Sequence, residues 1–167
     1  YISFDGASVG VLQGKGVVAG LRTTGMYGKK PVVAELHGGQ TDNNSTLFKN
    51  GYESVLNPLY KNGTFVKGPQ QYVPDWDNQK AGTIFEQMFT KAKGDFVGVA
   101  AANDGLGGAV AAVHKREGAS EDIPTTGQDA TDEGLQRVLL GTQCVTVYKA
   151  IKMEADAAAQ LAIALAK

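Results

Sequence analysis

The sequence predicts an α/β fold: a three-layer, Rossmann-like lobe in which helices cover both faces of a parallel β-sheet. Two observations predict this class. Short apolar runs alternate with longer segments of helical periodicity along nearly the whole chain, which is the pattern of βαβ units. The run DFVGVAAA at residues 95–102 is also continuously apolar after its first residue, as expected for a strand that is buried on both faces.

Six short segments rich in apolar or β-branched residues are expected to be strands. They are residues 1–4, 30–37, 64–73, 95–102, 123–127 and 143–148. Pro69 interrupts the third segment, because proline cannot donate a hydrogen bond to a neighbouring strand.

Six further segments are expected to be helical, because their apolar residues recur every three to four positions. They are residues 7–21, 44–63, 78–94, 104–118, 131–141 and 150–167. Asp5 precedes the first of them and is suited to cap it. The third has a strong apolar face, made of Ala81, Ile84, Phe85, Met88 and Ala92.

The composition is that of one globular domain. The chain has 167 residues, of which 43% are hydrophobic and 20% charged, and its net charge is −1. The absence of a basic excess argues against a nucleic-acid binder, since such proteins gain affinity from clustered Lys and Arg. Cys144 is the single cysteine, which excludes an internal disulfide. No apolar stretch approaches the ~20 residues that cross a bilayer.

Both ends of the sequence suggest a piece of a longer protein. The chain opens with YISFD, without an initiator Met or a leader, and its last residues, AAAQLAIALAK, still follow a helical pattern. We therefore expect this chain to be a fragment or a processed part of something larger.

The residues that follow the expected strands are the first candidates for a binding site, because ligands of open parallel sheets bind at the carboxyl ends of the strands. Polar or aromatic residues follow five strands: Asp42, Asn43 and Asn44; Trp76; Asn103 and Asp104; Asp129; Lys149. The alternative for Asp42, Asn103 and Asp129 is helix capping, since each precedes an expected helix. Capping requires neither the single tryptophan nor the lysine, however.

Two motifs raise an enzymatic alternative. GASVG at residues 6–10 matches the nucleophile elbow of α/β-hydrolases, and HGG at residues 37–39 is similar to their oxyanion loop. Their order in the chain is the reverse of the hydrolase order, and the only histidines are His37 and His114. DGLGGAV at residues 104–110 matches part of a dinucleotide-binding fingerprint but has Val110 in place of the third glycine. Capped helix starts with small packing residues explain both glycine motifs better.

Six segments carry a resemblance that runs nearly from end to end. They are YISFD, GG…DNN…LF, QYVPDW, AAND…GGA, GQDA and GTQCVTVYK, in this order. With them the chain resembles bacterial periplasmic sugar-binding proteins of the ribose/galactose type, and most closely their D-xylose-binding members.

This resemblance implies two Rossmann-like lobes joined by three hinge crossings, with a sugar held between them. Residues 1–5 would be a hinge-crossing strand, residues 6–148 the second, sugar-binding lobe, and residues 149–167 a hinge and a helix that returns to the first lobe. The sugar-binding residues implied in this lobe are Asp42, Asn44, Trp76, Asn103, Asp129 and Lys149. HGG and PDW differ from the usual family residues, which leaves the exact pentose open.

The implied function is non-catalytic binding of a monosaccharide, D-xylose or a related pentose or hexose, for an ABC importer. No catalytic residue, metal or cofactor is expected. The partners would be the sugar, the membrane permease, the first lobe and, for this chain alone, a second copy; nucleic acid would not be one. The implied location is the periplasm, or the outer face of a membrane by an anchor. A ligand-sensing domain of a LacI-type regulator, which shares the fold, is the alternative, and a hydrolase is a more remote one.

Overall fold

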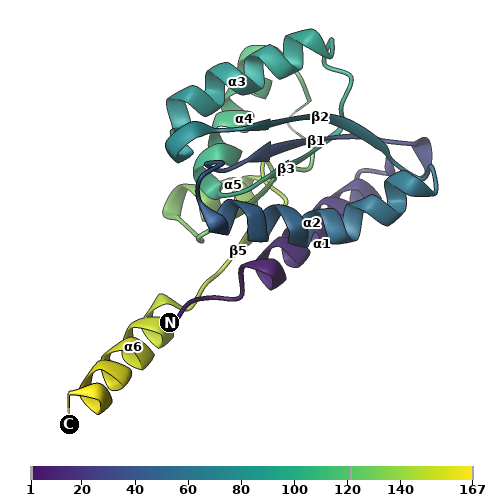
Figure 1. The fold of residues 1–167 in the computed structure, drawn as a ribbon. Coiled ribbons are helices and arrows are strands. Elements are labelled where there is room, and N and C mark those ends of the chain that lie inside the picture. The colour runs from purple at the N-terminus through teal and green to yellow at the C-terminus, as the bar shows by residue number, and fades with distance from the viewer. Residues whose placement is uncertain (1, 121, 167) are drawn as a thin grey trace.

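A parallel five-strand arrangement forms the centre of the molecule in the computed structural model, which describes residues 2–120 and 122–166 (Figure 1). The strands are β1 (Val32–His37), β2 (Val66–Tyr72), β3 (Gly98–Ala101), β4 (Thr126–Gln128) and β5 (Val145–Val147). They pair in the orders β2-β1-β3 and β4-β5, and a parallel bridge between Val99 and Thr125 joins the two groups. Every pairing is parallel, so the carboxyl ends of all five strands lie along one edge.

Helices cover both faces of this sheet. The helices are α1 (Gly6–Thr23), α2 (Asn43–Lys61), α3 (Asn78–Lys91), α4 (Asp104–Arg116), α5 (Asp132–Leu140) and α6 (Ile151–Leu165). The pair α1 and α2 lies on one face, and α3 and α4 lie on the other (Figure 1). The expected three-layer α/β fold with a parallel sheet is therefore confirmed.

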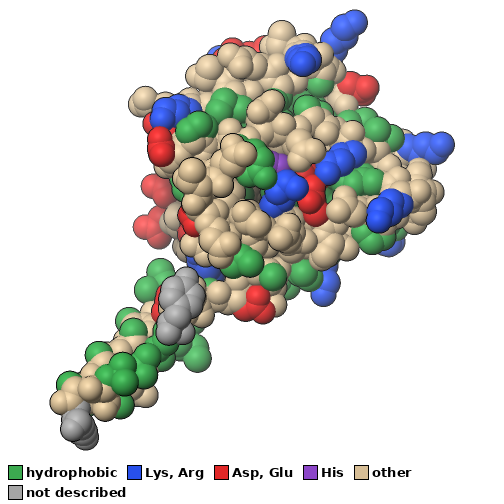
Figure 2. Space-filling view, in the orientation of Figure 1, with side chains coloured by type: hydrophobic (Ala, Val, Ile, Leu, Met, Phe, Trp, Pro, Cys, Tyr) green, Lys and Arg blue, Asp and Glu red, His purple; other side chains and the backbone are tan. Residues whose placement is uncertain are grey.

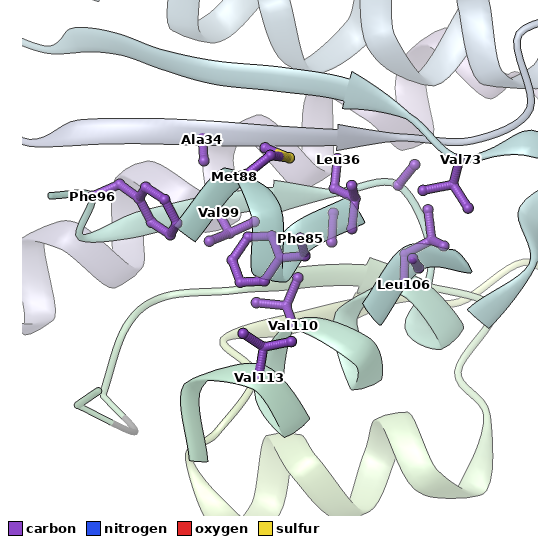
Figure 3. Packing of buried hydrophobic residues seen from close by; sticks show 13 residues of the cluster. Ala34, Leu36, Val73, Phe85, Met88, Phe96, Val99, Leu106, Val110 and Val113 are labelled. Atoms are coloured by element: carbon purple, nitrogen blue, oxygen red, sulfur yellow. The ribbon is translucent and has the colours of Figure 1, made fainter. Parts of the chain in front are cut away.

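The core consists of two layers, one on each side of the sheet. β1 divides its side chains between them: Ala34 and Leu36 face the layer under α3 and α4, whereas Val33 faces the layer under α1 and α2. In the first layer, Phe85 of α3 and Leu106 of α4 meet the sheet residues (Figure 3). Because both faces of β1 are covered, residues 33–37 of the strand are all buried, including the polar Glu35 and His37.

The expected helices and five of the expected strands are present with shifts of a few residues at their ends. Pro69 does not break β2, because β2 lies at the edge of the sheet and the pairing with β1 shifts register between Val33 and Glu35. Asp5 caps α1 as expected, since its carboxylate accepts a hydrogen bond of 3.0 Å from the Ser8 amide.

The strand expected at residues 1–4 is wrong for residues 2–4; Tyr1 lies outside the described residues. These residues are irregular and pair with no strand in the described parts of the chain. A strand needs a neighbouring strand to form its ladder of hydrogen bonds. The apolar character of a segment does not by itself provide such a neighbour.

The helix α6 projects away from the sheet and its covering helices (Figure 1). None of its described residues is buried, and apolar side chains are spread along it (Figure 2). The segment before α6 and the segment before α1 leave the globular body at the same corner (Figure 1). Within residues 2–120 and 122–166, none of the helices has both the length and the hydrophobicity needed to cross a membrane.

Candidate functional site

A hollow of about 460 Å³ lies at the carboxyl edge of the sheet. The six residues singled out in the sequence all line it: Asp42, Asn44, Trp76, Asn103, Asp129 and Lys149. They come from the ends of five different strands, and the parallel sheet brings them together because its carboxyl ends share one edge. Their role as ligand-binding residues remains a prediction, whereas their proximity is a property of the fold.

Asp42 serves the loop after β1 in two ways. One carboxylate oxygen, Oδ1, accepts a hydrogen bond of 2.8 Å from the Asn44 amide and so caps α2. The other, Oδ2, accepts a hydrogen bond of 3.0 Å from the indole Nε1 of Trp76. Capping and site formation are therefore not alternatives here, since one carboxylate does both.

Trp76 is held in place from several sides. It ends the short 3₁₀ helix Pro74–Trp76, in which Asp75 and Trp76 have positive φ angles of 58° and 57°. Its ring lies edge-on to Phe48, with 6.3 Å between the ring centroids. A Cβ atom added to Gly38 would come within 2.1 Å of the Trp76 ring, so the loop backbone packs directly against it. A fixed, flat aromatic face suits the C–H side of a sugar ring.

The rest of the predicted lining consists of Asn103, Asp129 and Lys149. Asn103 caps α4, accepting a hydrogen bond of 2.9 Å from the Leu106 amide. The Lys149 ammonium lies 2.9 Å from the Asp129 carboxylate and is only 18% exposed. It also lies 5.7 Å from the ring centroid of Phe4 and 5.6 Å from that of Phe48. These residues add an amide, a carboxylate and an ammonium to the lining of the hollow.

Sequence reasoning missed Gln128, the last residue of β4, which also lines the hollow. Its side chain is only 3% exposed, and its Oε1 atom is buried without a hydrogen-bond partner in the described structure. A buried amide oxygen of this kind is costly unless a donor reaches it. The signal was available, since Gln128 directly precedes Asp129 at a strand end. Phe48 was also missed, because its place on the apolar face of α2 indicates only core packing.

The two histidines lie outside the hollow. The His37 ring, fully buried, makes hydrogen bonds with the Tyr52 hydroxyl and with Gln70 Oε1, the latter at 3.2 Å. Burial lowers the pKa of His37 to about 4. The Ser8 hydroxyl of the GASVG motif donates to the Asp5 carboxylate instead of to a histidine. These two motifs therefore do not form a nucleophile–base pair.

His37 belongs to a buried polar cluster under α2. Glu35 on the same strand is fully buried, accepts a hydrogen bond of 3.2 Å from the Tyr60 hydroxyl, and lies 3.8 Å from the His37 ring. Burial raises the pKa of Glu35 to about 7. This cluster lies apart from the hollow and supports the end of β1. Across residues 2–120 and 122–166, no group of three or more His, Cys, Asp or Glu side chains is arranged to hold a metal ion.

A protein-family model and two relatives match nearly the whole chain. The model of the periplasmic binding protein domain matches residues 1–167. The D-xylose-binding periplasmic proteins of Haemophilus influenzae and Escherichia coli are 36% and 34% identical over 100% and 99% of this chain. The chain spans about half the length of these relatives, 48% of each.

Solved structures agree on the fold. A carbohydrate transporter solute-binding protein from Chloroflexus aurantiacus, in complex with D-glucose, matches 99% of this chain and 54% of its own, with a TM-score of 0.81 and 26% identity. A periplasmic solute-binding protein of an ABC transporter from Actinobacillus succinogenes covers 98% of this chain and 54% of its own, with a TM-score of 0.84 and 20% identity. Since the family model matches the whole sequence, the chain belongs to the periplasmic binding protein domain family.

Proposed function

We propose that this chain is the second lobe of a two-lobed protein that binds a monosaccharide, D-xylose or a related pentose or hexose, without catalysis. The protein would be the solute-binding component of an ABC sugar importer. The observation that carries the proposal is the convergence of Asp42, Asn44, Trp76, Asn103, Asp129 and Lys149 on one hollow.

The chemistry of these side chains suits a sugar. Each sugar hydroxyl both donates and accepts hydrogen bonds. Carboxylates accept from hydroxyls in charge-assisted bonds, amides donate and accept, and the lysine ammonium donates. Trp76 offers an apolar face to the ring. A site that pairs every hydroxyl discriminates against analogues that lack one, because buried polar groups would then be left without partners.

The relatives support the sugar class. Two curated relatives are named D-xylose-binding periplasmic proteins, and a structural relative that is 26% identical holds D-glucose. Their names also support a periplasmic location for this protein. Because the chain spans about half of those relatives, we infer that residues 1–5 and 149–167 are connections to a first lobe, and residues 6–148 the second lobe itself. Sugar bridging the two lobes would close the hinge, and a membrane permease would recognise the closed form.

Titration calorimetry on the full-length protein tests this function. D-xylose, D-arabinose, D-ribose and D-glucose are titrated in turn, with L-leucine as a control ligand of another class. We expect one of the sugars to bind with a single site and the amino acid to give no heat of binding. Absence of binding by every sugar would refute the proposal. Trp76→Ala in the same titrations should weaken sugar binding, because the stacking face is lost.

A further inference from the structure

A further acid, Asp104, lies close to the hollow but outside its lining. It is the first residue of α4 and only 1% exposed, and it does not line the hollow. Its carboxylate accepts four hydrogen bonds. Oδ2 accepts from the Thr131 amide at 2.9 Å, the Thr131 hydroxyl at 3.2 Å and the Thr146 hydroxyl at 2.8 Å. Oδ1 accepts from Gln143 Nε2 at 2.7 Å. One side chain of α4 thereby connects the start of α5, β5 and the turn before β5.

The space around this carboxylate fits it closely. A Cβ atom added to Gly127 or to Gly134 would lie 2.1 Å from one of its oxygens. Arg137 holds both Asp104 and its partner Gln143, since its Nη2 donates to the Asp104 backbone carbonyl at 2.6 Å and its Nε to Gln143 Oε1 at 3.0 Å. The carboxylate sits at the N-terminus of α4, where the helix dipole favours a negative charge. A group with so many donors and so little free space has one orientation only.

The segment that Asp104 binds has an unusual backbone. Asp129 and Ala130 are consecutive non-glycine residues with φ angles of 102° and 50°. Such conformations persist only when surrounding contacts impose them. The three amides in this segment are all engaged: Asp129 with the Val147 carbonyl at 3.0 Å, Ala130 with the Thr146 hydroxyl at 3.0 Å, and Thr131 with Asp104. Asp104 therefore supports two of these three amides: it accepts directly from the Thr131 amide, and it holds the Thr146 hydroxyl that accepts from the Ala130 amide.

We propose that Asp104 is a positioning residue of the sugar site, which holds residues 129–131 in their strained conformation and so directs the Asp129 carboxylate into the hollow beside Lys149. The predicted effect on sugar binding rests on the proposed function, whereas the predicted effect on the conformation of residues 129–131 does not. Asp104 itself would not touch the sugar. In Asp104→Asn, one acceptor oxygen becomes an NH₂ group that faces donors, so at least one of the four hydrogen bonds is lost.

A double-mutant cycle tests the proposal in the full-length protein, using titration with the sugar that binds best. We expect Asp104→Asn to weaken binding at least tenfold in the unsubstituted protein. In the Asp129→Ala background, the same change should weaken binding less than twofold, because the carboxylate that it positions is already absent. Equal weakening in both backgrounds, or no weakening, would overturn the proposal. Thr146→Val should reproduce the pattern more mildly, and it replaces Asp104→Asn if that variant does not fold.

Hydrogen exchange on the sugar-free protein gives a second readout that a general loss of stability would not produce. In Asp104→Asn, the amides of residues 129–134 should exchange faster while those of β1 and β3 do not. Faster exchange throughout the chain, or unchanged exchange at 129–134, would contradict a positioning role. Val113→Ala is the matched control, since Val113 is buried on the same helix but belongs to the layer that faces α3. It should lower the unfolding temperature and leave sugar affinity unchanged.

The two readouts separate the two hypotheses. If the unsubstituted protein binds no sugar, the proposed function fails, and hydrogen exchange alone decides whether Asp104 holds the loop. If the protein binds sugar and the cycle is additive, the function stands and the positioning role of Asp104 falls.

Discussion

Asp129 is the residue whose loss should affect sugar binding most clearly. Its carboxylate lines the hollow and pairs with Lys149 at 2.9 Å, so it offers a charged acceptor that is already oriented. Removing a charged hydrogen-bond partner costs about 1.5–3 kcal/mol. We therefore expect Asp129→Ala to weaken pentose binding by about tenfold to 150-fold in calorimetric titrations of the full-length protein. Asp132→Ala removes the same charge nearby but outside the hollow, and it should leave affinity unchanged. Equal affinity in Asp129→Ala would remove this residue from the site.

His114 is expected to make the fold sensitive to acid. It is 3% exposed, and its ring lies 5.3 Å from Phe85 and 6.4 Å from Phe96 between centroids. Burial among these rings lowers its pKa to about 4, from 6.5. Between these values the unfolded chain binds the proton and the folded chain does not. Stability from His114 is therefore complete above pH 6.5 and is lost as the pH falls towards 4.

His114→Leu tests this effect. Relative to the unsubstituted chain, the variant should be more stable at pH 5 than at pH 7.5, by about 2 kcal/mol for a pKa shift of this size. Thermal unfolding at the two pH values measures the difference. If the stability difference between the variant and the unsubstituted chain is the same at pH 5 and at pH 7.5, His114 is not responsible for acid sensitivity.

Two other buried groups modify this pH dependence in opposite directions. His37, with its pKa lowered to about 4, adds to the loss of stability below pH 6.5. Glu35, with its pKa raised to about 7 from 4.5, is protonated in the folded chain, so its contribution is present below pH 4.5 and is lost as the pH rises to 7. Because two imidazoles oppose one carboxyl between pH 4.5 and 6.5, these groups together still favour the folded chain at higher pH.

The sequence could predict which residues lie near one another at the carboxyl edge of the sheet, because the topology alone determines this. Asp42 and Asp129 follow different strands, and a parallel sheet brings all carboxyl ends to one edge, so their meeting needed no knowledge of side-chain contacts. The hydrogen bond between Asp42 and Trp76, and the anchoring of the loop by Asp104, depend on side-chain directions that no periodicity encodes. Asp104 could be seen only as one of two polar residues after β3.

At the scale of elements, the loop between β1 and α2 and the 3₁₀ turn that carries Trp76 depend on each other. A Cβ atom on Gly38 would come within 2.1 Å of the Trp76 ring, whereas one on Gly39 would lie 3.5 Å from it, an ordinary contact distance. Gly38→Ala should therefore displace the indole, break its hydrogen bond to Asp42, and weaken sugar binding about tenfold or more. Gly39→Ala is the matched control. In the 167-residue chain, where Trp76 is the only tryptophan, its fluorescence should shift in Gly38→Ala alone.

Helices were the most predictable elements and the first segment the least. The apolar face of α3 is long enough for its period to be unambiguous, and Ala81, Phe85 and Met88 are buried as expected. Residues 1–4 are apolar but short, and whether such a run becomes a strand depends on a neighbour that lies elsewhere. The lengths of β4 and β5, three residues each, likewise follow from pairing and not from propensity.

At the scale of the whole molecule, the main feature to explain is the exposed helix α6, none of whose described residues is buried. It projects from the body, and Ile151, Ile163 and Leu165 are 65%, 60% and 78% exposed. A helix with such exposed apolar side chains tends to find another surface. We infer that this surface is the first lobe in the full-length protein. In the isolated 167-residue chain a second copy is the expected substitute, since symmetric pairs are the commonest closed assemblies.

Sedimentation of the isolated chain tests this expectation. The chain should associate in a concentration-dependent manner, and a chain shortened to residues 1–149 should remain monomeric at the same concentrations. A monomer whose α6 stays helical and exposed, by hydrogen exchange, would contradict the inference.

The openness of the hollow leads to a last expectation about affinity. This lobe alone presents one set of hydrogen-bonding groups to a sugar, and the opposite side of the sugar would remain in water. Hydrogen bonds that stay exposed to water contribute little net free energy, because the same groups can pair with solvent. The isolated 167-residue chain should therefore bind sugar with a Kd of about 1 mM or weaker, equivalent to no more than ~4 kcal/mol.

Titration followed by the fluorescence of Trp76 measures this directly, since that ring lines the hollow. The full-length protein should bind the same sugar much more tightly, because closure of two lobes removes water from both sides of the ring. Micromolar binding by the isolated chain would mean that this lobe forms a complete site and that a second lobe is not needed for recognition.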